Sequence, residues 1–258
     1  MKLRKAMAVM AAACVCIPAV IFANPTSTTT FGSLPGATFG GIGNPNNAVE
    51  VTTITTGSDT LTLGLAAQQR FENSVLGNNG NGTYFATPGA NYGNPANPGS
   101  TAGVSTILGS TWDFDYYVNI AGGGNLSDYK FVLSYALTPG TALGQLGTVN
   151  VNGIAPYLGF SSTGTIVQDS ENLDFAFLGT STPGLISPPA GSFNPNAGGD
   201  YLFTLDAYDS SGDLIGQSDI NVDVSAVPDS SWSIGLLGIG VLSLCSFRRF
   251  FEFHKQMV

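Results

Sequence analysis

The sequence predicts an all-β fold: a single β-sandwich, immunoglobulin-like or jelly-roll-like and antiparallel, over residues 49–226. Apolar residues alternate with polar ones in several segments, which is the period of a strand that buries one face. The connections are rich in Gly, Asn, Pro, Thr and Ser, which favour turns. No segment has a convincing amphipathic helical pattern. Short alternating segments joined by turns are typical of a sandwich.

Three segments carry the clearest alternation. Their apolar positions are Leu61, Leu63, Leu65 and Ala67; Trp112, Phe114, Tyr116, Val118 and Ile120; and Tyr129, Phe131, Leu133, Tyr135 and Leu137. We expect each set to face the core, because alternate side chains of a strand point to the same side. The stretch 64–77 also admits a helix, but the first alternating set runs straight into it and favours a strand.

The segment 201–224 predicts a hairpin. Two alternating runs flank residues 209–212, where Asp at the first position and Gly at the fourth fit a type I turn followed by a left-handed glycine. Simple pairing across this turn would put Phe203 opposite Asp219 and point the later apolar residues to the other face. We therefore expect a bulge near Gly216, which restores a common apolar face.

The first 23 residues predict a secretory signal peptide. Basic residues precede an apolar run, and Ala23 is the expected cleavage site. Pro18 interrupts the apolar run, which argues against an uncleaved membrane anchor. A Gly/Pro/Thr-rich segment, residues 24–48, then leads into the sandwich.

A second apolar run, residues 232–247, predicts a single transmembrane helix near the C-terminus. Its 16 residues would be roughly 24 Å long, slightly less than a ~30 Å hydrocarbon core. Arg248 and Arg249 follow at once and begin a basic tail, residues 248–258, that the positive-inside rule keeps in the cytoplasm. Residues 24 to about 228 are then expected outside a bacterial inner membrane.

The part between these ends is strongly acidic and lacks cysteine. Arg70 and Lys130 are its 2 basic residues against 15 acidic ones, a net charge of −13 over residues 24–228. A field of that sign repels nucleic acid and anionic membrane surfaces, so nucleic-acid binding is excluded. Because every cysteine lies in one of the two ends, we expect neither a disulfide nor a thiolate metal site in the exported part.

The exported part offers few groups for catalysis. The single histidine, His254, lies in the cytoplasmic tail, so no Ser-His or Cys-His arrangement is possible outside. A glycosidase would need a pair of carboxylates. The candidates are Asp113 with Asp115, and Asp169, Glu171 and Asp174. Asp113 and Asp115 fall on the polar face of their strand, where side chains meet water. We therefore expect no catalytic and no cofactor-binding residue.

Calcium is the ion that exported carboxylates favour, because it prefers hard oxygen ligands. The run Asp209–Asp213 is similar to a calcium loop but lacks its full spacing and distal Glu, which favours a simple turn. Tyr84, Tyr92 and Tyr157, in Gly/Asn-rich loops, are candidates for stacking on sugar rings or for anchoring their loops. No metal-binding residue is expected, and calcium binding is an alternative.

The C-terminal end resembles the VPDSG-CTERM relative of the PEP-CTERM sorting signals. Val227-Pro228-Asp229-Ser230 forms the short motif, Ser231 stands where the family has Gly, and the apolar helix and Arg248-Arg249 follow. In those families an exosortase, an inner-membrane enzyme that resembles cysteine transpeptidases, recognises such an end and cuts near the motif. The resemblance implies that the chain is an exosortase substrate, held in the inner membrane by residues 227–258 until it is cut.

The middle of the chain is similar to one recurrent type of PEP-CTERM protein. The similarity rests on Asn79–Phe85, Trp112–Tyr116 and Phe193–Gly212, and it spans most of residues 50–226. It implies a surface or secreted component associated with extracellular polysaccharide, biofilm or floc formation. We therefore expect a non-enzymatic surface or matrix protein. A secreted carbohydrate- or calcium-binding module is the alternative, and a carboxylate-pair glycosidase is a third hypothesis.

Overall fold

The computed structural model describes residues 24–72, 74–91, 109–158 and 164–225. The expected signal peptide with Ala23 and the expected sorting signal, which includes Val227–Ser230 and Arg248-Arg249, lie outside these ranges. Within them, no helix is both long and apolar enough to cross a membrane.

The first sheet, sheet A, is antiparallel throughout. Its strands lie in the order β1 (Thr26–Gly32), β2 (Val49–Thr56), β3 (Asp59–Gln69), β9 (Trp112–Ala121) and β12 (Ile166–Glu171), and β4 (Ser74–Val75) pairs with the end of β3. β1 pairs along its whole length with β2. The sheet therefore takes in part of the segment 24–48, before the expected start of the sandwich.

The second sheet, sheet B, contains one parallel pair. Its order is β13 (Ile186–Ser187), β11 (Gly147–Asn150), β10 (Lys130–Tyr135), β14 (Gly199–Tyr208), β15 (Leu214–Val224), β6 (Thr83–Ala86) and β5 (Gly77–Asn78). β6 runs parallel to β15, and the other pairs are antiparallel. The expectation of a wholly antiparallel fold is wrong at this pair.

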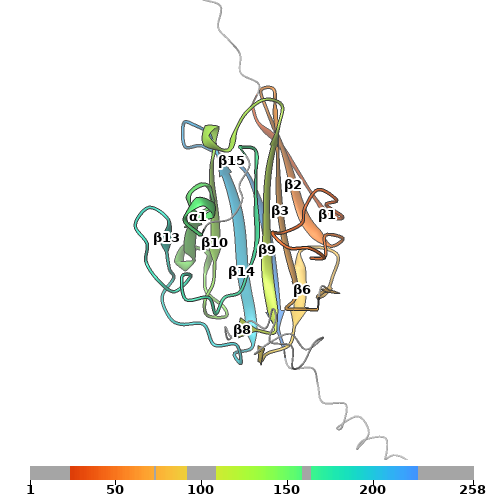
Figure 1. The fold of residues 1–258 in the computed structure, drawn as a ribbon, viewed down its shortest axis with the longest axis vertical. Helices are drawn as coiled ribbons and strands as arrows, with labels where there is room; N and C mark the ends of the chain where they lie inside the picture. Colours follow the sequence, from red (N-terminus) through yellow and green to blue (C-terminus); the bar gives the residue numbers. More distant parts are fainter. Residues whose placement is uncertain (1–23, 73, 92–108, 159–163, 226–258) are drawn as a thin grey trace, which may run out of the picture.

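Five short elements complete the described fold. They are the paired strands β7 (Ala90–Asn91) and β8 (Gly109–Ser110), the helix α1 (Val151–Leu158), and the 3₁₀ turns Leu126–Asp128 and Leu143–Gln145. Figure 1 shows the long strands of both sheets running along the long axis, with α1 and β13 on one side and β1 and β2 on the other.

The two sheets face each other across one core. β15 contacts β2 and β3, and β14 contacts β3. The three alternating sets predicted from the sequence are buried in this core, except that Tyr129 is only partly buried. Phe114 of sheet A stacks on Phe203 of sheet B with ring centroids 4.5 Å apart, and Trp112 meets Phe203 edge-on at 6.2 Å. The expectation of an all-β fold is confirmed.

The predicted hairpin and its bulge are also confirmed. β14 and β15 pair so that Phe203 lies opposite Ile220, and the register shifts between Ala207, opposite Gly216, and Tyr208, opposite Leu214. Ile215 is thus the extra residue of a bulge beside Gly216. In the turn, Gly212 has a φ of 88° and donates its N–H to the Asp209 carbonyl over 3.0 Å.

Candidate functional site

The face of sheet A that points away from the core is covered by chain. A Cβ on Gly64 would lie 2.8 Å from the Leu34 side chain, and one on Gly36 would lie 3.3 Å from the Tyr117 hydroxyl. The segment 33–48 therefore packs across β3 and β9. Further along the same face, Gly109 of β8 lies directly against the guanidinium of Arg70.

Asp113 and Asp115 project from β9 under this cover. The Asp115 residue is 0% exposed, and the Asp113 side chain is 15% exposed. The expectation that both side chains meet water is wrong, because strand alternation shows which face points away from the core but not which distant segments cover it.

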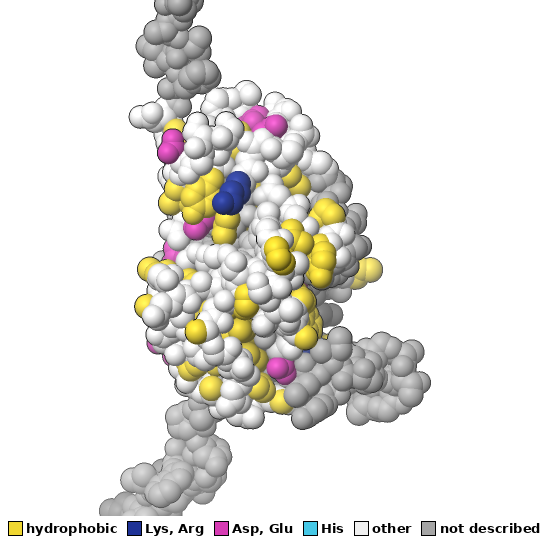
Figure 2. All heavy atoms as spheres, turned by 90° about the vertical axis from the view of Figure 1, so that its left-hand side faces the viewer, with side chains coloured by type: hydrophobic (Ala, Val, Ile, Leu, Met, Phe, Trp, Pro, Cys, Tyr) yellow, Lys and Arg dark blue, Asp and Glu magenta, His cyan; other side chains and the backbone are white. Residues whose placement is uncertain are grey.

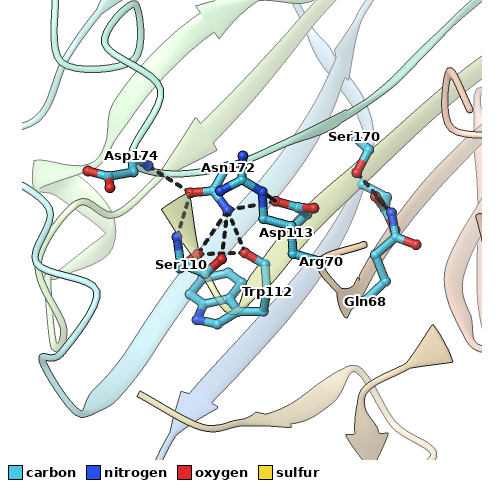
Figure 3. Close-up of polar contacts among 9 residues, drawn as sticks. Gln68, Arg70, Ser110, Trp112, Asp113, Ser170, Asn172 and Asp174 are labelled. Atoms are coloured by element: carbon cyan, nitrogen blue, oxygen red, sulfur yellow. Dashed lines mark hydrogen bonds and ion pairs between the residues drawn. The ribbon is translucent and has the colours of Figure 1, made fainter. Parts of the chain in front are cut away.

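These two carboxylates belong to a polar cluster that joins strands far apart in the sequence (Figure 3). Its members are Gln68 and Arg70 from β3 and the residue just after it, Ser110 from β8, Asp113 and Asp115 from β9, Ser170 from β12, and Asn172 just after β12. All seven are buried except Asp113, which is nearly so, and Ser170, which is half-buried.

Asn172 is the centre of the cluster (Figure 3). Its Nδ2 donates to Asp113 Oδ1 at 2.6 Å, to the Trp112 carbonyl at 2.9 Å and to Ser110 Oγ at 3.0 Å. Its Oδ1 accepts the backbone N–H groups of Ser110 at 3.0 Å and Asp174 at 3.1 Å. One side chain thus ties the short strand β8 to the start of β9 and the end of β12.

Arg70 is the buried cation of the cluster. It is 4% exposed, its Nε lies 3.9 Å from Asp113 Oδ1, and its guanidinium lies over the rings of Phe71 and Phe175 at 4.6 and 5.6 Å. Nη1 is buried without a hydrogen-bond partner among the described atoms. Burial lowers the pKa of this guanidinium, and the charges of Asp113 and Asp174 oppose that shift.

The cluster contains two carboxyl groups, those of Asp113 and Asp115, and one basic side chain, that of Arg70. Burial raises the pKa of Asp113 to about 6, although hydrogen bonding from Asn172 and the charge of Arg70 act in the other direction. Burial also raises the pKa of Asp115 well above its ordinary value, despite hydrogen bonds from Ser170 and Gln68. Gln68 Nε2 donates to Asp115 Oδ1 at 3.0 Å and to Ser170 Oγ at 2.9 Å. These bonds hold the strands together, although Gln68 Oε1, Asp115 Oδ2 and Arg70 Nη1 are buried without a partner among the described atoms.

Asp169 and Glu171 lie apart from this cluster, on the core-facing side of the edge strand β12. They pair across the sheet with Tyr116 and Phe114 and are 8% and 4% exposed. Burial raises the pKa of Asp169 to about 6 and that of Glu171 well above its ordinary value, and the nearby charge of Asp169 raises the pKa of Glu171 further. The structure therefore brings these two predicted candidates together.

A hollow of about 690 Å³ opens beside Asp169, at the edge of β12. It is lined by residues of the segment 35–46 and by Ile166, Gln168 and Asp169. Gln168 Oε1 accepts the N–H groups of Thr38 and Phe39, both at 2.8 Å, and Asn44 Nδ2 donates to the Phe39 carbonyl at 2.9 Å. These bonds hold Phe39 at a φ of 45°, a left-handed conformation that a bulky residue rarely adopts.

The other candidate site residues from the sequence analysis lie at separate places in the structure. Asp174 is partly buried beside Arg70, and Asp209–Asp213 forms the β14–β15 turn, where Asp209 Oδ1 accepts the N–H groups of Ser211 and Asp213 at 2.8 and 3.0 Å. The hypothesis that Tyr84 stacks on a sugar ring is wrong, because Tyr84 is fully buried and its hydroxyl donates to the Ala48 carbonyl at 2.7 Å. Tyr157 is 58% exposed but lies on α1, and Tyr92 lies outside the described residues.

Sequence reasoning missed Arg70, Asn172 and Gln68. One signal was present for Arg70, since a single arginine among the 15 acidic residues of the segment 24–228 is expected to neutralise a buried carboxylate. Asn172 and Gln68 carry no comparable signal, because an amide is as common in a loop or on a strand surface as in a buried network.

Comparisons with known proteins give no match for the chain. No family model, no curated protein and no solved structure matches it. Within the described ranges, no group of three or more His, Cys, Asp or Glu side chains is placed to hold a metal ion.

Proposed function

We propose that the chain is a non-enzymatic exported protein of the bacterial surface or extracellular matrix, associated with exopolysaccharide or biofilm. In this proposal the signal peptide directs export, and residues 232–247 hold the domain at the inner membrane. An exosortase then processes the end at Val227–Ser230. The two-sheet domain, of immunoglobulin-like or jelly-roll-like kind, is the part that acts after processing.

The position of the last described strand carries this proposal. β15 ends at Val224, and the Ser225 N–H donates to the Ala86 carbonyl at 3.0 Å. The expected recognition motif begins at Val227, two residues further on. A cut at or after the motif would thus remove no strand of either described sheet.

The enclosed polar cluster supports a non-catalytic role for the domain. Its carboxylates are directed at Asn172, Gln68 and Arg70. A carboxylate-pair glycosidase would need both carboxyl groups to face a sugar. On the face drawn in Figure 2, acidic and apolar side chains are spread among polar ones and basic side chains are scarce. That distribution suits a component of a hydrated matrix.

The sorting step can be tested in the native bacterium by replacing Val227–Ser230 with four alanines. The variant is expected to stay in the inner-membrane fraction, whereas the unchanged chain leaves it. Asp223→Asn, in the last strand, is the matched control and should be released normally. Equal release of the alanine variant would contradict the proposal.

A secreted carbohydrate- or calcium-binding module is the second candidate function, and the hollow beside Asp169 favours it. Titration calorimetry of the full-length chain in detergent, with calcium and with a panel of oligosaccharides, tests it directly. Heat of binding to an oligosaccharide would place the protein among binding modules, and its absence would leave the structural role as the better account.

A further inference from the structure

The pair Asp169–Glu171 is a buried concentration of negative charge, and no basic side chain of the described residues is paired with it. The two side chains stand two residues apart on one face of β12, close enough for each to act on the pKa of the other. The basic residues of the described part act elsewhere: Arg70 faces Asp113, and Lys130 lies over the Tyr208 ring at 5.6 Å. Two buried carboxylates that lie close together need either a shared proton or a bound cation to offset their negative charge.

Two buried oxygen atoms, one in the pair and one opposite it in the sheet, have no hydrogen-bond partner among the described atoms. Asp169 Oδ2 is buried and has no hydrogen-bond partner among the described atoms, although Oδ1 accepts the Ser170 N–H at 2.9 Å. The hydroxyl of Tyr116, opposite Asp169 in the sheet and 2% exposed, is unpartnered in the same way. Buried polar atoms are nearly always satisfied, so two such oxygens next to a carboxyl pair point to a missing ligand.

The hollow provides a route to the pair. Asp169 is one of its lining residues. Gly40 reaches over the carboxyl group so closely that a Cβ there would lie 2.7 Å from Asp169 Oδ1, and its φ of 71° also suits glycine. Gly40 therefore brings backbone, not a side chain, up to the carboxyl group. An ion in the hollow would meet Asp169 first.

We propose that Asp169 and Glu171 bind a calcium ion that enters through this hollow. Carboxylate oxygens are hard donors that calcium prefers, and water in the hollow would complete its coordination. Two protein carboxylates and an open side fit the weak class of extracellular sites, with dissociation constants of about 0.1–1 mM. This site is independent of the sorting proposal, since neither carboxylate belongs to the C-terminal signal.

Terbium luminescence and thermal unfolding of the full-length chain in detergent test the proposal. Tb³⁺ is a calcium substitute that emits when a nearby tyrosine is excited, and Tyr116 lies opposite Asp169. We expect sensitised emission that excess calcium abolishes, and a rise in Tm of several degrees on adding calcium after EDTA treatment. Asp169→Asn with Glu171→Gln should abolish both responses, whereas the exposed turn variant Asp213→Asn should keep them.

Three results would overturn the site. The first is an unchanged calcium response in the Asp169→Asn, Glu171→Gln chain, and the second is its loss in Asp213→Asn. The third is an absence of both Tb³⁺ emission and a Tm shift in the unchanged chain up to roughly 10 mM calcium, about ten times the weak end of extracellular sites. In that case a proton shared between the two carboxyl groups, and no calcium ion, offsets their charge. This third result needs only the unchanged chain, so it decides the question even if the double variant fails to fold.

Discussion

The burial of Asp113 predicts that the folded domain loses stability as the pH rises. The pKa of this carboxyl group is raised from 3.8 to about 6 in the folded protein. Between these two values the folded state holds a proton that the unfolded state has released, so stability falls by about 1.4 kcal/mol per pH unit. Over the interval of about two units the loss is about 3 kcal/mol. The contribution is fully present below pH 3.8 and is lost as the pH rises through about 6. Asp115 acts in the same direction, because burial raises its pKa as well.

Urea unfolding of residues 24–225 in EDTA, followed by tryptophan fluorescence from pH 4 to pH 8, measures this effect. Trp112, which is buried in the core, directly precedes Asp113 on β9 and is the single tryptophan of that fragment. Asp113→Asn cannot titrate, so its free energy of unfolding should fall by about 3 kcal/mol less than that of the unchanged chain over this range. The exposed Asp213→Asn should follow the unchanged chain. Equal slopes for the unchanged chain and Asp113→Asn would refute the reasoning.

Three further predictions concern the architecture. Asn172→Ala removes the acceptor for Ser110 and the amide that binds Asp113, so it should lower the free energy of unfolding by roughly 2–4 kcal/mol in urea titrations. Gly216→Val would drive a side chain into Ile54 and should cost about 1–3 kcal/mol, whereas Gly77→Ala, whose nearest neighbour is 3.9 Å away, should cost less than about 1 kcal/mol. Residues 24–225 alone should fold with a cooperative transition and a β-rich circular dichroism spectrum. A broad, non-cooperative transition would show that the fold needs the chain beyond β15.

Local patterns were sufficient to predict the strands and the hairpin. The alternating sets from Leu61, Trp112 and Tyr129 lie in the core because a strand with one buried face must alternate. The bulge at Ile215 was predictable because an unshifted register would have paired Phe203 with a charged residue. These features depend on residues close together in the sequence.

The features that the sequence did not predict depend on contacts between distant segments. β6 pairs with β15 although more than 120 residues separate them, and no local pattern reports such a pairing. The helix α1 contains Gly153 and Pro156, which disfavour a helix, and Val151 and Ile154 are buried in the core that it packs against. Asp113 and Asp115 were placed in water because the segments that cover them come from elsewhere in the chain.

The mass of the exported protein tests the central proposal most directly. Intact-mass spectrometry of the mature protein from a strain that has the exosortase should find a chain that begins at Asn24 and ends within or just after Val227–Ser231. A mature protein that still carries residues 232–258 in such a strain would contradict the proposal that the C-terminal end is a processing signal.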